Sequence, residues 1–336
     1  MARVLVDSPL PQLDQLFDYV VPERLRDAAR VGMRVKVPLR TGGRIAQGWL
    51  VELVETSEYG GRLSELDDVV GEVPLLTPDV WRLARAAADR AAGNASDILR
   101  LAIPSRYVRV ERSWRQSEPD PGPLPAAGEV TGFEAGRVER GILHGERMSL
   151  AADPRPVELG SGIWVGAWAV TLAQAACVAL AADRSALLVV PDHRDQEQLE
   201  AALAAFVDPR RVLRTDARQA GGDRYRAFLE STRDPARVII GNRSTVYAPA
   251  ARLGLIALFE DGDPLYAEPL APGVHARDAA LVRQEQSGAA LMFLGHTRSV
   301  EVARLVGLGW VHEVGRLRHT RPKVVLTEQQ AAPEPG

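Results

Sequence analysis

The stretch RVIIGNRSTVYAPAARLGLIALFEDGD, residues Arg237–Asp263, decides the fold of this 336-residue chain. It holds two short runs of consecutive apolar residues, Val238–Ile240 and Leu255–Phe259, and acidic residues follow the second run directly. Unbroken apolar runs of this length are typical of strands that a parallel sheet buries on both faces. A Gly-x-Arg-Ser turn at Gly241–Ser244 follows the first run. The stretch therefore predicts two buried strands of an α/β sheet.

The chain from about Val157 onward extends this pattern. Strands are expected at 186–190, 238–240, 255–259, 291–294 and 324–326. Helices are expected between them at 165–182, 194–206, 223–229, 275–285 and 300–306. This alternation predicts a parallel sheet with helices on both faces, a three-layer α/β/α lobe over residues 157–326. A disordered tail is expected at 327–336.

Residues 1–105 predict a small β-rich domain. Short apolar or alternating runs are separated by turn signals, and Gly42-Gly43 between two such runs suggests a hairpin. A helix is expected from about Pro78 to Ala92, because Thr77 can serve as its N-cap and proline suits its first position. Residues 106–156 are expected to form a linker and a reduced helical segment, since 116–125 is rich in proline and acidic residues.

The composition is that of an ordinary soluble globular protein, with 46% apolar and 25% charged residues. A single cysteine, Cys177, excludes a disulfide framework and a cysteine-ligated zinc site within this chain, and we expect its thiol to be buried. The most apolar long run, Ile163–Ala182, contains Gln174 and two tryptophans, which favours a core helix over a membrane span. The start of the chain does not resemble a signal peptide, so a cytoplasmic location is expected.

Charge is distributed unevenly along the N-terminal residues. The net charge of −3 does not indicate a nucleic-acid-binding protein. However, 24–44 carries seven cations against one acidic residue, whereas 52–72 carries seven acidic residues and one arginine. A local basic stripe can bind phosphate even when the total charge is negative. The candidates for contact with a DNA backbone are Arg34, Lys36, Arg40 and Arg44.

Two groups of motifs resemble the PriA family of primosomal replication-restart proteins. PLP at 9–11, LFDYVVPE at 16–23 and VGMRVKVP at 31–38 resemble the family's N-terminal DNA-binding module. VP at 190–191, IGNRS at 240–244, AP at 248–249, LGLI at 253–256 and HARD at 275–278 follow its first helicase lobe in order and approximate spacing. The resemblance covers residues 1–105 and 160–325, and the chain is most similar to the shortened actinobacterial branch.

The resemblance implies a pocket that grips the 3′-OH end of a DNA strand at a stalled fork, with Phe17 and Asp18 among its residues. An aromatic ring can stack on the terminal base, and a carboxylate can accept a hydrogen bond from a free 3′-OH but would repel a 3′-phosphate. The alternative is that Phe17 belongs to the core and Asp18 caps a turn. Two departures count against an identical pocket, since Arg40 replaces a glycine and Asp67 a lysine.

The helicase-like lobe departs further from its family. A phosphate loop has the pattern G-x-x-x-x-G-K-[ST], whose lysine binds phosphate and whose hydroxyl binds Mg²⁺. Gly160, Ser161 and Gly162 match its glycine-rich part, but Ile163-Trp164 stands where lysine and threonine are required. Counting back from Val190-Pro191 instead places Trp168 at the lysine position. Neither alignment supplies a cation or a hydroxyl ligand.

The metal-binding segment of the lobe is also changed. The family's D-E-E-H segment reads Phe259-Glu260-Asp261-Gly262, so the metal-binding aspartate is absent although Glu260 fits the general base. Loss of one preorganised electrostatic contact lowers a rate by about 10²–10³, so loss of lysine, hydroxyl and aspartate together predicts no useful turnover. Gly160, Ser161, Gly162, Glu260 and Asp261 are thus a degenerate nucleotide site. No catalytic or metal-binding residue is assigned, and the family's ATP, Mg²⁺ and zinc are not expected as cofactors.

The sequence therefore predicts a pseudo-helicase that binds forked, branched and single-stranded DNA and helps to reload the replicative helicase. The resemblance implies primosome proteins, helicase-loading proteins and single-strand-binding protein as partners, and no membrane. Arg243, in the Gly-x-Arg-Ser turn, either contacts single-strand phosphates or bonds to a neighbouring carboxylate. One rival is an active ATP-dependent 3′-5′ helicase of superfamily 2. Another is a protein scaffold that uses the helix face beginning at His275.

Overall fold

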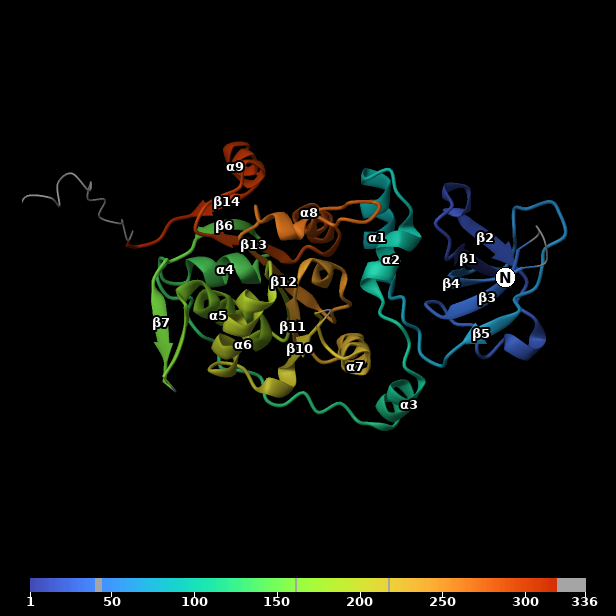
Figure 1. Ribbon diagram of the computed structural model, residues 1–336, viewed down its shortest axis with the longest axis horizontal. Coiled ribbons are helices and arrows are strands. Elements are labelled where there is room, and N and C mark those ends of the chain that lie inside the picture. Colours follow the sequence, from blue (N-terminus) through green and yellow to red (C-terminus); the bar gives the residue numbers. More distant parts are fainter. Residues whose placement is uncertain (40–43, 161, 217, 319–336) are drawn as a thin grey trace, which may run out of the picture.

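The computed structural model describes residues 1–39, 44–160, 162–216 and 218–318. A β-rich N-terminal module lies at one end of the molecule, a larger α/β lobe lies at the other, and helices stand between them (Figure 1). The Gly42-Gly43 turn, the strand expected at 324–326 and the tail expected at 327–336 fall outside the described residues.

The N-terminal module is a five-stranded antiparallel sheet. Along the chain its strands are β1 Ala2–Val6, β2 Leu16–Tyr19, β3 Arg34–Pro38, β4 Ile45–Leu53 and β5 Asp68–Val70. Their order across the sheet is β2-β1-β4-β3-β5. In β3 the alternation is clear, since Val35 and Val37 are buried and Arg34 and Lys36 face the other way. Short 3₁₀ turns, Pro11–Leu13 and Glu23–Leu25, follow β1 and β2.

The segment that leads into β5 lies at the outer edge of β2. An isolated bridge joins Val20, just after β2, to Glu65, just before β5, so that the sheet curls toward a barrel. Inside lies an apolar core that includes Val4, Val35 and Leu66. Strand β2 itself, which precedes this bridge in the chain, is an edge strand of the sheet.

Three helices connect the module to the lobe, α1 Pro78–Arg90, α2 Ala95–Ala102 and α3 Val108–Gln116. Pro78 occupies the first turn of α1, as the sequence predicts. Their buried residues, such as Leu83 and Ile98, join one core cluster with Leu291 and Phe293 of the lobe. Although residues 1–105 were expected to form a separate domain, α1 and α2 share their core with the lobe, because their apolar faces pack on its helices.

The lobe is built on a seven-stranded sheet whose neighbouring strands all run parallel. In the order β10-β11-β9-β12-β13-β6-β14 the strands are Val212–Arg214, Val238–Gly241, Ser185–Val189, Leu253–Phe259, Ala290–Gly295, Arg147–Ala151 and His312–Val314. Side chains alternate between two cores, with Ile239 on one face of the sheet and Val238 and Ile240 on the other.

Helices cover both faces of this sheet, which confirms the predicted three-layer α/β/α class. They are α4 Arg137–Leu143, α5 Ala167–Ala181 and α6 His193–Ala204 on one face and α7 Gly221–Ser231, α8 Ala276–Ser287 and α9 Val300–Gly307 on the other. Short 3₁₀ helices lie at Pro209–Arg211, Arg243–Tyr247 and Pro264–Tyr266. None of the helices in the described ranges combines the length and apolarity that crossing a bilayer requires.

The expected linker at 106–156 needs correction. Its strand β6 lies inside the lobe's sheet, between β13 and β14, so the sheet begins before residue 157. The strand is short and follows a turn, and its pairing with β13, which is distant in sequence, determines its place. Residues 118–128 lack helix and strand, as expected, yet Arg211 on the lobe donates hydrogen bonds to the carbonyls of Gly122 and Pro123.

Candidate nucleic-acid interface

A cavity of about 880 Å³ opens beside the outer edge of β2. Its lining includes Phe17 and Asp18 from β2, Leu39 after β3, and Tyr59 and Ser64 from the loop before β5. Neighbours on a strand project to opposite faces, so Phe17 and Asp18 reach this cavity from the two sides of the edge strand. The sequence-predicted pair is thus in a cavity.

The carboxylate of Asp18 is held by two partners that the sequence did not indicate. The Ser57 hydroxyl donates a hydrogen bond to Oδ2, and the Arg3 guanidinium lies 3.5 Å from Oδ1. Arg3 faces Asp18 directly across the β1–β2 pair. A carboxylate offers about four acceptor positions, so these contacts orient it and leave acceptor capacity toward the cavity. Asp18 thus fixes the loop containing Ser57 rather than capping a turn of its own.

The ring of Phe17 belongs to the core and also lines the cavity. It lies opposite Val4 and packs against the core of the N-terminal module, while half-buried at the cavity wall. A ring fixed by packing on one side offers the other side as a rigid surface for a base.

Three cations of the basic stripe are bonded to the acidic stretch that follows it, and one of them forms an ion pair. Lys36 lies 3.3 Å from Asp68 across the β3–β5 pair. Arg24 and Arg30 donate to the backbone carbonyls of Asp67 and Glu72. The stripe therefore contributes less free charge than the sequence suggests.

The remaining candidates on the stripe differ in their surroundings. The Arg34 guanidinium lies 4.7 Å from the centre of the Trp49 ring, a cation–π contact. Arg44 is exposed, and its side chain has no hydrogen-bond or ion-pair partner among the described residues. Arg40 lies outside the described residues. Of the three candidates that the structure describes, Arg44 is therefore the cation most accessible to a DNA phosphate.

The segment expected to carry a phosphate-loop remnant forms a β-hairpin. β7 Pro156–Leu159 pairs antiparallel with β8 Ile163–Gly166, and Gly160 and Gly162 lie in its turn. Ser161 of that turn is outside the described residues. The hairpin exposes Trp164, whose relative accessibility is 61%. Gly160 and Gly162 therefore do not form the strand-to-helix turn whose N–H groups bind phosphate.

Helix α5 begins directly after this hairpin, and Trp168 in its first turn reaches the sheet. Its indole stacks on Phe259 at the end of β12, with 3.8 Å between ring centroids and 13° between planes. The imidazole of His296, just after β13, packs edge-on against the Phe259 ring, with 5.8 Å between ring centroids. All three residues lie at the carboxyl ends of the parallel strands or beside them, where α/β sheets bind ligands.

The acidic residues at this edge already have protein partners. Glu260 has a φ of 51°, and its Oε1 accepts a bond from the His296 backbone N–H at 2.7 Å and lies 2.6 Å from Nδ1 of the same residue. Asp261 is buried, accepts from the Ser299 hydroxyl and lies 3.7 Å from Arg277. An Mg-nucleotide does not fit this arrangement, because a stacked aromatic pair stands in place of the ammonium and the metal ligand.

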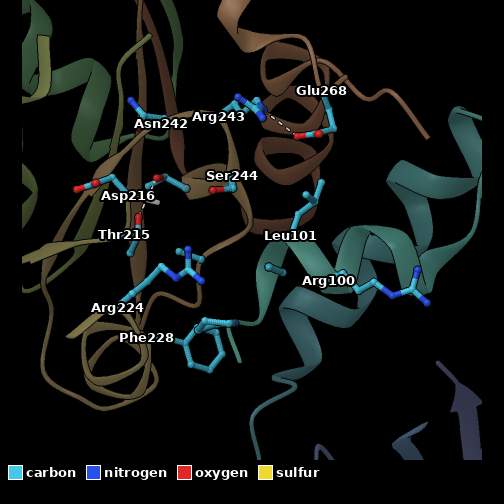
Figure 2. A pocket seen from close by; sticks show the side chains of 14 residues that line it. Arg100, Leu101, Thr215, Asp216, Arg224, Phe228, Asn242, Arg243, Ser244 and Glu268 are labelled. Atoms are coloured by element: carbon cyan, nitrogen blue, oxygen red, sulfur yellow. Dashed lines mark hydrogen bonds and ion pairs between the residues drawn. The ribbon is translucent and has the colours of Figure 1, made fainter. Parts of the chain in front are cut away.

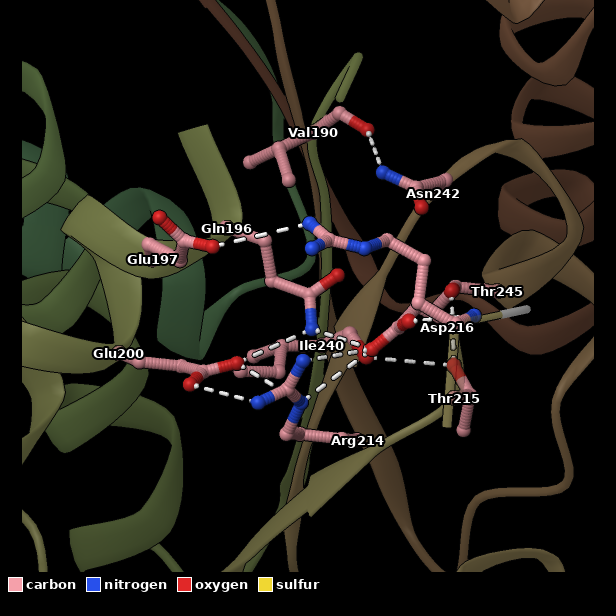
Figure 3. Close-up of polar contacts among 11 residues, drawn as sticks. Val190, Gln196, Glu197, Glu200, Arg214, Thr215, Asp216, Ile240, Asn242 and Thr245 are labelled. Carbon is pink, nitrogen blue, oxygen red and sulfur yellow. Dashed lines mark hydrogen bonds and ion pairs between the residues drawn. The ribbon is translucent and has the colours of Figure 1, made fainter. Parts of the chain in front are cut away.

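The opposite half of the sheet edge carries a polar network that the sequence did not indicate (Figure 3). Asp216, after β10, accepts from Arg214 at 2.9 Å and from the Gln196 amide at 3.0 Å. Burial alone would raise the pKa of Asp216, but these bonds lower it overall. Nearby, the Thr215 and Thr245 hydroxyls lie 2.8 Å apart. The network thus holds the ends of β10 and α6 together.

Arg243 adjoins this network at a smaller pocket (Figure 2). Its Nε donates to the buried carboxylate of Glu268 at 2.7 Å, the structural bond that was one of two roles left open. Its side chain is nevertheless 38% exposed, so its terminal nitrogens remain accessible. On α8, by contrast, the face beginning at His275 is mostly buried against α1 and the sheet, which leaves little of it for a partner.

Comparison with known proteins finds a family match in the N-terminal part of the chain. Residues 3–104 match the model of the PriA 3′DNA-binding domain. The chain is 37% identical to the "Probable replication restart protein PriA" of Mycobacterium leprae over 334 residues, which is 97% of this chain and 50% of that protein. The chain belongs to the PriA family.

Other relatives support this assignment. The Mycobacterium tuberculosis (strain CDC 1551 / Oshkosh) protein of the same name is 38% identical over 95% of this chain and 48% of its own length. The "Replication restart protein PriA" of Bacillus subtilis is 30% identical over 31% of this chain and 13% of its own. The chain spans about half the length of the mycobacterial PriA proteins it matches. The PriA match extends over the whole lobe, including the segment with Trp168 and Phe259.

Proposed function

We propose that this PriA-family chain binds branched DNA at an arrested fork through its N-terminal module and does so without hydrolysing ATP. The observation that carries the proposal is the cavity at β2, in which Phe17 and Asp18 lie together. The match of residues 3–104 to a 3′DNA-binding domain supports the same site.

The chemistry of this cavity suits a strand terminus. The terminal base stacks on the exposed side of the Phe17 ring. The 3′-OH donates a hydrogen bond to the Asp18 carboxylate, which Ser57 and Arg3 hold in place. A 3′-phosphate brings two negative charges to the same carboxylate, and the repulsion excludes it.

The absence of ATP turnover in this proposal is supported by the edge of the lobe's sheet. Trp168 and Phe259 stack where phosphoryl transfer needs a lysine and a metal-binding aspartate. Glu260, which fits the general base, bonds instead to His296. The lobe then contributes shape and DNA backbone contact, and no step proceeds through a nucleotide.

In the cell, such a chain would act in the cytoplasm as a platform on which primosome proteins and single-strand-binding protein reload the replicative helicase. Arg44 and the accessible nitrogens of Arg243 are the proposed DNA backbone contacts. The proposal requires a fork with an arrested 3′ end as the ligand.

A single preparation can test both parts of the proposal. Fluorescence anisotropy compares forks that differ only in a 3′-OH or a 3′-phosphate on the arrested strand, and the 3′-OH fork should bind more tightly. ATP hydrolysis is measured with and without single-stranded DNA and should stay at background. Equal binding to both forks would contradict the proposal that the cavity at Phe17 and Asp18 selects a 3′-OH end. DNA-stimulated hydrolysis that Glu260→Gln abolishes would establish the rival, an active helicase.

A further inference from the structure

The smaller pocket, between α2 and the ends of β10 and β11, has a lining whose charges are unequally satisfied (Figure 2). We call it the α2–α7 pocket; it has a volume of about 290 Å³ and is lined by Arg100, Asp216, Arg224, Arg243, Ser244 and Glu268, among others. Three arginines and two carboxylates thus face one space. Which of them are free determines what the pocket can bind.

Each oxygen of the two carboxylates in the pocket already accepts a hydrogen bond. Asp216 accepts from Arg214 and Gln196 through Oδ2 and from the backbone N–H of Arg218 through Oδ1. Glu268 accepts from Arg243 through Oε2 and from the backbone N–H of Leu270 through Oε1. Because every carboxylate oxygen already has a donor, the acidic side chains present little uncompensated negative charge to a ligand.

One of the cations, in contrast, lacks a partner. Arg100 is paired with two carboxylates, because it bonds to Asp7 through two nitrogens and to Asp97 through the third. The Arg224 side chain extends from α7 into the pocket and forms no hydrogen bond or ion pair within the described part of the chain. Its Nε is buried and unsatisfied, an arrangement that costs free energy unless an acceptor is bound.

A neutral donor completes the candidate site. The Ser244 hydroxyl lines the same pocket and has no hydrogen-bond partner among the described residues. The guanidinium of Arg224 has a planar set of donors that matches a phosphate group, and the accessible nitrogens of Arg243 add a second cation. The lining therefore suits an anion with several acceptor oxygens.

We propose that the α2–α7 pocket binds one phosphate group, with Arg224 as its principal ligand and Ser244 and Arg243 beside it. The identification of the group as a backbone phosphate of single-stranded DNA rests on the proposed function. Arg100 links the two sites, since it lines this pocket and bonds to Asp7. Asp7 directly follows β1, which pairs with β2 at the 3′-end cavity.

The test uses the full chain and an oligo-dT strand about 20 nucleotides long that ends in a 3′-phosphate, so that binding does not depend on the Asp18 cavity. Arg224→Gln should lower the affinity about threefold to tenfold at low salt and reduce the slope of log K against log salt by about 0.7. Arg224→Lys should keep the slope, because the charge remains. Arg226→Gln, an exposed arginine on the same helix, is the matched control and should change the slope less.

A second measurement separates DNA from free phosphate as the source of the group. Inorganic phosphate should raise the melting temperature of the wild-type chain and not of Arg224→Gln if the pocket takes a small anion. A change in either the DNA slope or the phosphate response that is specific to Arg224 supports the site. Identical behaviour of wild type and Arg224→Gln in both assays, or an equal loss in Arg226→Gln, would overturn it. Equal binding of the 3′-OH and 3′-phosphate forks would contradict the proposed 3′-end cavity, but it would not contradict phosphate binding in the α2–α7 pocket.

Discussion

The indole of Trp168 lies flat on the phenyl ring of Phe259, with centroids 3.8 Å apart. The pair joins the first turn of α5 to the end of β12, and both rings are buried in the core that α5 and α6 form with the sheet. In a nucleotide-hydrolysing lobe these two places hold charged groups that bind phosphate and metal. Here the same two elements are held together by an apolar contact that is part of the core.

Removal of one ring should therefore destabilise the fold. Phe259→Ala leaves a cavity beneath Trp168, and we expect the free energy of unfolding to fall by about 3–5 kcal/mol. Trp164→Ala, in the exposed hairpin, is the control and should change it by less than about 0.5 kcal/mol. Urea denaturation measures both. A loss below about 1 kcal/mol for Phe259→Ala would mean that the stack is not structural.

The 3′-end cavity gives a prediction about discrimination. Asp18→Asn removes the charge that repels a 3′-phosphate, so the preference for a 3′-OH fork should fall, by about tenfold if one charge-assisted contact is lost. Asp27→Asn makes the same change in net charge on the exposed part of the basic stripe and should leave the preference unaltered. Anisotropy titrations with both forks measure the ratio. An unchanged ratio in Asp18→Asn would place the 3′ end elsewhere.

Much of the lobe could be predicted because its signals are local. The runs at Val238–Ile240 and Leu255–Phe259 are apolar throughout, so they identify strands covered on both faces without knowledge of their partners. The prediction that a metal ligand is missing at Phe259 likewise rests on one position. Strand β6 carries no such signal, since its place depends on pairing with β13, more than a hundred residues away.

The state of individual charges could not be predicted, because it depends on contacts between distant segments. Lys36 was a candidate for DNA contact, yet β3 pairs with β5 and brings Asp68 to it. Asp18 was identified by its motif, but neither Arg3 nor Ser57 carried a sequence signal for holding it. Charge runs in a sequence therefore overstate the free charge on a folded surface.

The contact between α3 and α7 gives a third prediction. Glu111 is buried on α3, where it lies 2.7 Å from Arg106 and accepts from the Tyr225 hydroxyl of α7 at 2.7 Å. Burial would raise the pKa of Glu111, but the bonds from Arg106 and Tyr225 outweigh it and lower the pKa. Arg106→Met leaves an unpaired buried carboxylate and should cost about 3–5 kcal/mol of stability.

A second pair of variants checks the origin of that loss. Tyr225→Phe removes one hydrogen bond to a charged group and should cost about 1.5–3 kcal/mol. The double variant Arg106→Met with Glu111→Leu removes both charges and should recover part of the loss seen in Arg106→Met. Urea denaturation measures all of these. If the double variant were less stable than Arg106→Met alone, packing rather than the unpaired charge would explain the effect.

The start of α6 should make stability depend on pH. Burial, followed by the nearby Asp192 carboxylate, raises the pKa of Asp195 to about 6, whereas an unfolded aspartate titrates near 3.9. Between these values the folded chain binds more protons than the unfolded chain, so this group's stabilising contribution is complete below about pH 4 and is lost as pH rises through 6.

Asp195→Asn should remove this loss, because an amide does not ionise. Relative to wild type, the variant should gain about 1 kcal/mol at pH 7.5 after allowance for solvent screening, and almost nothing at pH 4. Asp223→Asn, in the exposed first turn of α7, controls for the loss of a carboxylate near a helix N-terminus. Urea denaturation at the two pH values measures the difference. A gain of equal size at both would show that the pKa of Asp195 does not differ between the folded and unfolded chain, and that its burial does not hold a proton on it.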